Sequence, residues 1–94
     1  MKVRFSKLAL AELDAILAEI RADNPGAAAR FDERVRGVIE RIAQFPEGAQ
    51  EVEMRPGVRR VPLVRYPYVI HYAMIEGDVM ILRFVHGARR NPWE

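Results

Sequence analysis

The stretch from Arg59 to Arg90, RRVPLVRYPYVIHYAMIEGDVMILRFVHGARR, decides the fold of this 94-residue chain. It holds two runs rich in β-branched, aromatic and other apolar side chains, Tyr68–Ile75 and Val79–His86. Residues 76–78, EGD, lie between the runs, and a glycine there favours a tight hairpin turn because glycine accepts a positive φ. The pattern predicts an antiparallel β-hairpin followed by a basic segment, and we expect partners to be contacted there.

A two-residue turn decides which side chains of the predicted hairpin share a face. One face then carries Val69, His71, Ala73, Ile75, Met80, Leu82, Phe84 and His86, and the other carries Tyr68, Ile70, Tyr72, Met74, Val79, Ile81, Arg83 and Val85. Because both faces are largely apolar, we expect the hairpin to lie centrally in its sheet, with helices on one face and another protein chain on the other. The sequence leaves open which face meets the helices.

Two amphipathic helices are predicted before this stretch. The first runs from about Lys7 to Ala22, behind Ser6, whose hydroxyl can cap the first turn. The second begins at Asn24 and Pro25, and its apolar residues then recur every three or four positions up to Pro46. The short break between them favours an antiparallel helical hairpin packed on the sheet.

Two further strands complete the expected sheet. Lys2–Phe5 is a short N-terminal strand, and Val58–Val64 precedes the hairpin after an exposed loop at residues 46–57. Pro62 cannot donate to a ladder, so we expect an edge or bulged strand there. The expected fold is a single α+β domain over residues 1–94, in the order β-α-α-β-β-β, with an antiparallel helical hairpin packed on a small, mainly antiparallel sheet.

Composition narrows the classes of function. No apolar run approaches the roughly 20 residues of a membrane span, and the N-terminus lacks the apolar segment of a signal peptide, so we expect a cytoplasmic protein with no membrane partner. The chain has no cysteine and two histidines, which excludes disulfides and thiolate metal sites and disfavours zinc. We expect no metal and no cofactor.

Charge is distributed unevenly along the chain. From Met54 to Trp93, seven arginines stand against two acidic residues, a balance of +5 within a chain of net charge +2. Guanidinium groups bind phosphate and carboxylate groups through paired hydrogen bonds. This basic end is either a solvated face or a surface for an acidic partner, nucleic acid or protein.

The order of elements and several motifs resemble the RelE/ParE superfamily of bacterial type II toxins, and its ParE branch most closely. The motifs are residues 66–72 (YPYVIHY), 79–83 (VMILR) and 86–90 (HGARR), with a Phe5-Ser6 entry into a Leu/Ile-rich helix. The resemblance implies a toxin held inactive by a cognate antitoxin, ParD-like or similar, in a hetero-oligomeric complex. It also implies a cellular target, which is DNA gyrase for ParE-like toxins and ribosome-bound mRNA for RelE-like toxins.

The resemblance and the charge pattern together give the candidate binding residues. Basic residues and the tryptophan of the C-terminal half are expected to contact the target: Arg59, Arg60, Arg65, Arg83, His86, Arg89, Arg90 and Trp93. Apolar residues of the first helix and the last strand are expected to contact the antitoxin: Leu13, Leu17, Phe84 and Val85. Direct binding of nucleic acid is a secondary expectation.

A RelE-type mRNA endoribonuclease is the alternative. RNA cleavage through the 2′-hydroxyl needs a general base, a general acid and a cation on the phosphate. His86 would be the base or acid, and the phosphate would be held by Arg60, Arg65 and Arg83. The similar YoeB-like nucleases carry tyrosine where this chain has Gly87, and RelE-like enzymes depend on a lysine-rich surface, whereas this chain has two lysines. We therefore expect no catalytic residues and inhibition of gyrase by binding alone; a non-toxic member that only binds its antitoxin stays open.

Overall fold

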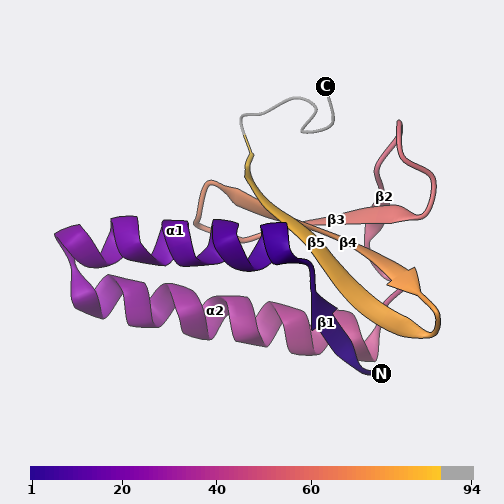
Figure 1. Cartoon of the computed structure of the whole chain (residues 1–94), viewed down its shortest axis with the longest axis horizontal. Helices are drawn as coiled ribbons and strands as arrows, with labels where there is room; N and C mark the ends of the chain where they lie inside the picture. Colours follow the sequence, from indigo (N-terminus) through magenta and orange to yellow (C-terminus); the bar gives the residue numbers. More distant parts are fainter. Residues whose placement is uncertain (88–94) are drawn as a thin grey trace.

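The structure is a computed structural model that describes residues 1–87. Its elements, in chain order, are β1 (Val3–Phe5), α1 (Lys7–Asp23), α2 (Pro25–Gln44), β2 (Gln50–Glu51), β3 (Val58–Pro62), β4 (Tyr68–Ile75) and β5 (Asp78–His86). Figure 1 shows the two helices side by side, with the sheet alongside them. The predicted order is confirmed, with one addition, the two-residue strand β2 in the segment expected to be a loop.

The strands form one sheet in the order β1-β5-β4-β3-β2. β1 runs parallel to β5, and the other neighbouring pairs are antiparallel. The predicted hairpin, β4 and β5, lies inside the sheet as expected. β2 covers β3 at Arg59 and Arg60, so Pro62 lies on an uncovered part of that edge, where a missing N–H breaks no ladder bond.

The β4–β5 hairpin has the predicted two-residue turn. Glu76 and Gly77 both have positive φ, 52° and 82°, and Ile75 pairs with Asp78 across the turn. Two successive positive φ angles are typical of a type I′ turn, whose twist matches that of antiparallel strands. The turn therefore fixes the register of the hairpin at this end.

A register shift in the middle of the hairpin was not predicted. Tyr72 pairs with Ile81, but the preceding residue, His71, pairs with Arg83. β5 therefore holds one extra residue, Leu82, in a β-bulge. Because side chains alternate along a strand, one extra residue exchanges the two faces of β5 beyond it.

The predicted faces of β5 are right between the turn and the bulge and wrong beyond the bulge. Phe84, predicted to share a face with His71, pairs instead with Ile70 and is buried in the core. Arg83 and Val85, predicted on the face of Ile70, lie on the opposite face. The bulge thus moves an arginine out of the core and a phenylalanine into it.

The core lies between the helical hairpin and one face of the sheet. It is a single cluster of buried side chains from both: Ala9, Ile16, Phe31, Val35, Ile42, Leu63, Ile70, Tyr72, Val79, Ile81 and Phe84. Ile70 and Tyr72 therefore face the helices, and His71 between them faces away, which answers the question that the sequence left open. The Tyr72 hydroxyl donates to the carbonyl of Pro46 at 2.7 Å and so fastens the end of α2 to the middle of the sheet.

Capping residues begin both helices as predicted. Ser6 Oγ accepts the N–H of Ala9 at 2.9 Å and donates to the carbonyl of Leu82 at 2.9 Å, so the start of α1 is tied to the bulge. Asn24 Oδ1 accepts the N–H of Ala27 at 3.1 Å at the start of α2. These bonds hold the helical hairpin in a fixed position against β5.

Candidate functional site

Three side chains form a row across the sheet on the face turned away from the helices. Arg60 of β3 pairs with His71 of β4, and His71 pairs with Arg83 of β5. Directly paired residues of neighbouring strands lie on the same face, about 5 Å apart. We call these three residues the cross-strand row. Two of them belong to the predicted target-binding set, and His71 was not predicted to be functional.

His71 is held in its neutral form. Its exposed fraction is 4%. Its pKa is lowered from 6.5 to about 4, first by burial and then by the positive charges of Arg60 and Arg83, against an opposing effect of Glu12. A neutral imidazole is a suitable proton acceptor, but burial keeps a substrate hydroxyl away from this ring.

Arg83 is paired within the molecule. Both carboxylate oxygens of Glu12, on α1, accept from its Nε at 3.2 Å, and Oε2 accepts from its Nη2 at 2.6 Å. Glu12 also accepts the backbone N–H of Phe84 at 3.0 Å. The hydrogen bond to Glu12 is the main cause that raises the pKa of Arg83 above its ordinary value. Arg83 therefore joins α1 to β5, and its guanidinium is engaged by this carboxylate.

Arg59 is also hydrogen-bonded within the molecule, in its case to backbone carbonyls. Its Nη1 donates to the carbonyl of Ala49 at 2.6 Å and to that of Glu47 at 3.2 Å. It pairs with Tyr72, so it lies on the face of the sheet that meets the helices. The pKa of Tyr72 is raised by burial, against an opposing effect of the Arg59 charge. Arg59 thus fastens the loop after α2 to the sheet.

His86 lies on the opposite face of the sheet from the cross-strand row. It pairs with Tyr68, and the two rings are in edge-to-face contact with centroids 5.6 Å apart. Tyr68 in turn contacts Phe31 of the core, which identifies this as the face that meets the helices. The sheet separates His86 from the side chains of Arg60 and Arg83, so these three predicted nuclease residues do not lie together. Arg65, the fourth, lies in the segment that connects β3 and β4.

A groove runs between α2 and β3 and ends at the turn between β3 and β4. Its volume is about 1080 Å³, and four arginines line it: Arg30, Arg34, Arg41 and Arg65. A neighbouring hollow of about 530 Å³ shares Val38, Arg41 and Val61 with it and continues to Phe45. We call the two hollows together the arginine groove.

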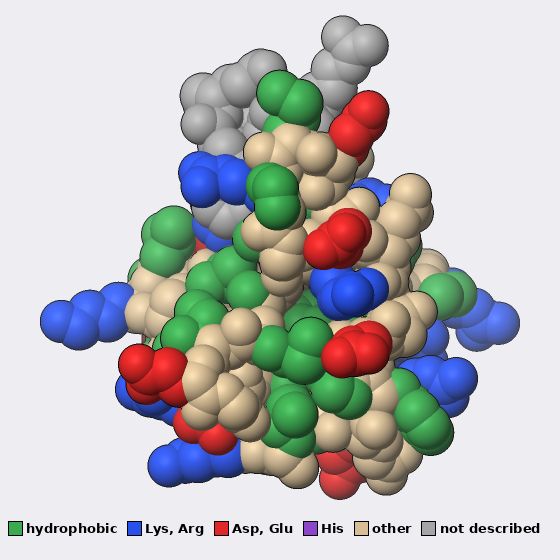
Figure 2. Space-filling view, turned by 90° about the vertical axis from the view of Figure 1, so that its right-hand side faces the viewer, with side chains coloured by type: hydrophobic (Ala, Val, Ile, Leu, Met, Phe, Trp, Pro, Cys, Tyr) green, Lys and Arg blue, Asp and Glu red, His purple; other side chains and the backbone are tan. Residues whose placement is uncertain are grey.

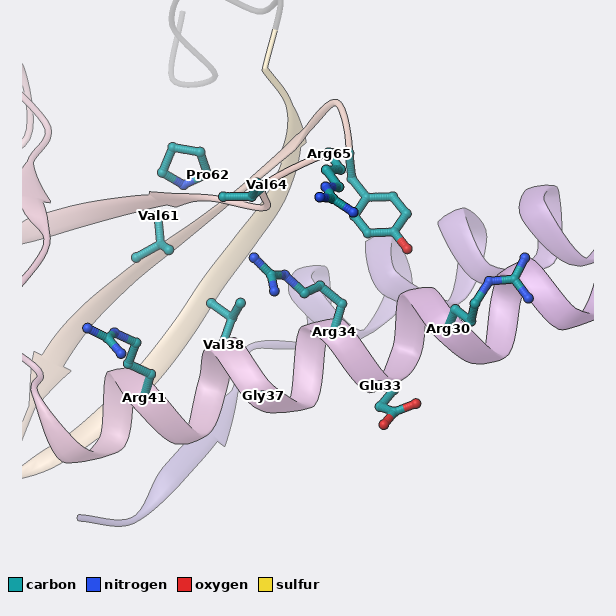
Figure 3. A pocket seen from close by; sticks show the side chains of 11 residues that line it. Arg30, Glu33, Arg34, Gly37, Val38, Arg41, Val61, Pro62, Val64 and Arg65 are labelled. Atoms are coloured by element: carbon teal, nitrogen blue, oxygen red, sulfur yellow. The ribbon is translucent and has the colours of Figure 1, made fainter.

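The walls of the arginine groove carry arginines on both sides. Figure 3 shows Arg34, Val38 and Arg41 rising from one side of α2 toward β3, with Arg65 on the opposite wall and Glu33 pointing away from the groove. Arg65 has a φ of 76°, so the turn places this side chain through a conformation that L-residues rarely adopt. Among residues 1–87, no ion pair within 4.0 Å involves any of these arginines.

The end of the molecule that carries β2 differs from the arginine groove in its charge. Figure 2 views this end and shows acidic and basic side chains interspersed around apolar ones. The segment after α2 includes three exposed acidic residues: Glu47, Glu51 and Glu53. Four arginines line the arginine groove, whereas this end of the molecule carries charges of both signs.

The sequence analysis missed the arginines of α2. In the first half of the chain, basic and acidic residues cancel, and that balance hid their arrangement. The available signal was spacing: Arg34, Val38 and Arg41 recur at four and three positions and so share one face of a helix. Asp32 and Arg36 pair with each other at 2.9 Å elsewhere on the helix surface.

The residues predicted to contact the antitoxin lie mostly inside the protein. Phe84 and Val85 are 2% and 5% exposed. Leu13 and Leu17 are partly buried against the core. Three predicted target-binding residues lie outside the described part of the chain: Arg89, Arg90 and Trp93.

Residues 1–87 hold neither a candidate metal site nor a candidate membrane span. No group of three or more His, Asp or Glu side chains in this part of the chain is placed to hold a metal ion. No helix in it is long and apolar enough to cross a membrane.

Each comparison with known proteins finds a toxin or a toxin–antitoxin system. The family model described as "ParE toxin of type II toxin-antitoxin system, parDE" matches residues 3–91. The putative toxin Y4kP of Sinorhizobium fredii is 33% identical over 91 residues, which cover 97% of this chain and 93% of that protein. Toxin RelE2 of Caulobacter vibrioides is 36% identical over 81 residues, covering 86% and 89% of the two chains. Among solved structures, the chromosomal ParDE toxin–antitoxin system from P. aeruginosa matches with a TM-score of 0.80 and 25% identity, over 92% of this chain and 95% of that one.

Proposed function

This chain belongs to the ParE toxin family of type II toxin–antitoxin systems, and from that premise we propose that it stops growth by binding DNA gyrase, with no chemistry of its own. It is the toxin component of such a system, and its partner is an antitoxin. The proposal concerns the target and the way in which the toxin acts on it. It places the action of the toxin in the cytoplasm.

The observation that supports the proposal is the separation of His86 from two of the three arginines predicted to hold the phosphate. His86 lies on the face of the sheet that meets the helices, and Arg60 and Arg83 lie on the other. Phosphodiester cleavage needs an acid or base and a cation within reach of the same phosphate. A toxin without that arrangement acts most simply by occupying a surface of its target.

The cross-strand row supports the same conclusion. His71 lies between two arginines, which is the arrangement that a nuclease would use, but it is 4% exposed. Arg83 is engaged by Glu12 on α1. This row favours the second candidate function, RNA cleavage, but the burial of His71 argues against that use.

The proposed target surface uses Arg60 and Arg65, which have no ion pair within the described residues. Arg89, Arg90 and Trp93, outside the described part of the chain, are also proposed to contact the target. Arginine and tryptophan are the residue types most often found at the energetic centre of protein interfaces. Arg59 and Arg83 have a supporting role in this proposal, because their guanidinium groups bond within the molecule.

The antitoxin is proposed to contact both the helical hairpin and the sheet. Leu8 and Leu10 of α1 are 51% and 47% exposed, so this helix presents apolar area to a partner beside the partly buried Leu13 and Leu17. We expect the complex to bury more than about 1,000 Å² in total, as specific interfaces do. Phe84 and Val85 are proposed to support this surface from within.

A gyrase supercoiling assay with purified toxin tests the proposal. The wild-type protein and the His86→Ala variant should both inhibit supercoiling, and the double variant Arg60→Ala/Arg65→Ala should need a higher concentration. The matched control removes two exposed arginines elsewhere, Arg4→Ala/Arg36→Ala, and should behave as wild type.

Two other outcomes would replace the proposal. Ribosome-dependent cleavage of mRNA that is lost in folded His86→Ala, with gyrase unaffected, would make the protein a RelE-type endoribonuclease. Absence of both activities in a protein that still binds its antitoxin would make it a non-toxic member of the family.

A further inference from the structure

The turn between β3 and β4 holds one arginine in a backbone conformation that this residue type disfavours. We propose that this turn, residues 63–66, is the part of the toxin that enters the surface of its target protein, with Val64 in an apolar pocket and Arg65 on a carboxylate. The inference rests on the proposed function, inhibition by binding, and names the element of the toxin that makes the contact.

Two backbone hydrogen bonds define the turn. The N–H of Tyr66 donates to the carbonyl of Leu63 at 2.9 Å, and the N–H of Leu63 donates to the carbonyl of Tyr68 at 2.9 Å. Arg65 is the third residue of the turn and has a φ of 76°. A positive φ at the third position is typical of a type II turn, and glycine or asparagine usually occupies that position. Glycine at position 65 would therefore suit the fold better than arginine does.

The side chain of Arg65 does not offset this strain within the described part of the chain. Arg65 is exposed, and among residues 1–87 its guanidinium forms neither an ion pair nor a hydrogen bond. Arg59 and Arg83, by contrast, bond to a loop and to α1. Strained residues are concentrated at sites of binding and catalysis, so the unused guanidinium of Arg65 points to a contact outside the molecule.

Val64, the residue before Arg65, is unusually exposed for an apolar side chain. Its exposed fraction is 60%, whereas that of Leu63 beside it is 1%. Figure 3 shows Val64 and Arg65 on the turn, across the arginine groove from α2. The turn thus presents apolar area together with a cation, and both gain when a protein surface covers them.

The turn is anchored at both ends, so it is presented in one conformation. Leu63 is buried in the sheet side of the core, and the ring of Tyr66 is in edge-to-face contact with Phe31, with centroids 4.9 Å apart. Pro67 follows and restricts the backbone further. A preformed contact element loses less conformational entropy on binding than a flexible loop does.

The pair of side chains favours a protein partner over nucleic acid. The guanidinium of Arg65 can bind a carboxylate or a phosphate through two parallel hydrogen bonds. A phosphate backbone, however, offers nothing apolar to Val64. We therefore assign the turn to a protein surface on which a carboxylate lies beside an apolar hollow.

Arg65→Gly tests the inference, because it should change stability and inhibition in opposite directions. Removal of the strain should raise the melting temperature by about 4 °C, a typical effect of a small stabilisation in a domain of this size. Loss of the guanidinium should raise the toxin concentration needed to inhibit gyrase supercoiling by at least about tenfold. Growth arrest on induced expression, which does not presuppose gyrase, should weaken in parallel.

Glu76→Gly is the matched control. Within residues 1–87, Glu76 is the other non-glycine residue with a positive φ, 52°, and it also lies in a tight turn at an end of β4. It lines neither hollow of the arginine groove. This variant should gain stability as Arg65→Gly does and should inhibit and arrest growth within about twofold of wild type.

Val64→Asp tests the apolar half of the contact. It should weaken inhibition at least about tenfold, because a carboxylate would enter an apolar pocket beside another carboxylate. Met54→Asp places the same carboxylate on a side chain that is 73% exposed in another loop, and it should act within about twofold of wild type. Circular dichroism should show unchanged folding for both, because both positions are exposed.

Three results would overturn the inference. The first is full inhibition and full growth arrest by Arg65→Gly and Val64→Asp. The second is an equal loss of activity in Glu76→Gly and Met54→Asp. The third is mRNA cleavage that Arg65→Gly weakens and Val64→Asp leaves intact, which would place Arg65 on a phosphate.

The inference and the proposed target fail separately. If the wild-type toxin arrested growth without inhibiting supercoiling, gyrase would be excluded, and the growth-arrest comparison of the four variants would still decide whether the turn makes the contact. If the wild-type toxin inhibited supercoiling and the turn variants did so equally well, the target would stand and the inference would be wrong.

Discussion

Glu12 and Arg83 lie 71 positions apart in the chain and form a two-pronged ion pair that joins α1 to β5. The two side chains are 19% and 13% exposed, and the same carboxylate also accepts the backbone N–H of Phe84. One side chain of the helical hairpin therefore accepts from three donors of the last strand, Nε and Nη2 of Arg83 and the N–H of Phe84, just beyond the point where β1 stops covering that strand.

Glu12→Gln should lower the free energy of unfolding by about 2 kcal/mol, because hydrogen bonds to a charged group contribute about 1.5–3 kcal/mol each. Urea denaturation checks this. Asp32→Asn breaks the exposed pair with Arg36 and should change stability by less than about 1 kcal/mol. Equal effects of the two substitutions would mean that Glu12 does not stabilise the fold through this pair.

Ile42→Ala should lower the free energy of unfolding by about 2–5 kcal/mol, as the removal of buried branched side chains does. Ile42 is 4% exposed and belongs to the core cluster. Ile75→Ala at the end of β4 is the control, because Ile75 is 41% exposed and little apolar area is lost there. Thermal unfolding followed by circular dichroism measures both; an unchanged melting temperature for Ile42→Ala would contradict the packing described.

His71 should make the protein less stable as the pH falls from about 6.5 toward 4. In this window the unfolded chain binds a proton on this imidazole, whereas the folded protein, with its lowered pKa of about 4, does not. The free energy of unfolding therefore falls as the pH falls, by at most about 1.4 kcal/mol per pH unit for one group. Above pH 6.5 the imidazole is neutral in both the folded and the unfolded chain, so no stability is lost there through this residue.

Proton NMR can follow His71 directly, because the chain has two histidines and His86→Gln identifies the remaining signals. His71 should titrate near pH 4 in the folded protein. A midpoint near 6.5 would show that the ring is neither buried nor affected by Arg60 and Arg83. Denaturation of His71→Gln beside wild type then isolates the pH dependence that this residue contributes.

Toxicity should depend more on the basic C-terminal segment than on His86. Truncation after Ala88 removes Arg89, Arg90 and Trp93, and loss of an interface residue of these types typically weakens binding by about 2 kcal/mol, or about 30-fold. Growth arrest on induced expression should therefore weaken with the truncation and persist with His86→Ala. If the truncated protein stayed fully toxic and folded His86→Ala did not, general acid–base catalysis, which contributes about 10²–10⁴ in rate, would be the better account.

Local signals in the sequence predicted most of the fold. The Ser6 and Asn24 caps, the break between the helices and the glycine at position 77 each act through neighbouring residues, and all of them are confirmed. The bulge at Leu82 was missed because no residue in β5 marks it. The Leu82 carbonyl accepts from the Ser6 hydroxyl, a tertiary contact that the sequence of β5 does not reveal. That one missed residue reversed the predicted faces of Arg83 and Phe84.

The site was harder to predict than the fold because the sequence does not show whether an arginine bonds within the protein or points to a partner. Arg59 and Arg83 were predicted to contact the target from the resemblance and the charge pattern, and the structure shows them bonded to a loop and to α1. The arginines of α2 were overlooked because their charge is balanced in the sequence count. Only the packing of α2 against β3 brings Arg34 and Arg65 to the same groove.

The parallel pairing of β1 with β5 has a consequence for synthesis on the ribosome. β1 precedes both helices in the chain, and its partner strand follows every other element of residues 1–87. The helices and β3–β4 can form local contacts earlier, but the sheet cannot close around β5 until that strand has emerged. At the 5–20 residues per second typical of translation, this leaves an interval of several seconds in which the growing chain has no complete binding surface. A toxin built in this way becomes competent only after β5 has been made, which gives an antitoxin already in the cell time to meet it.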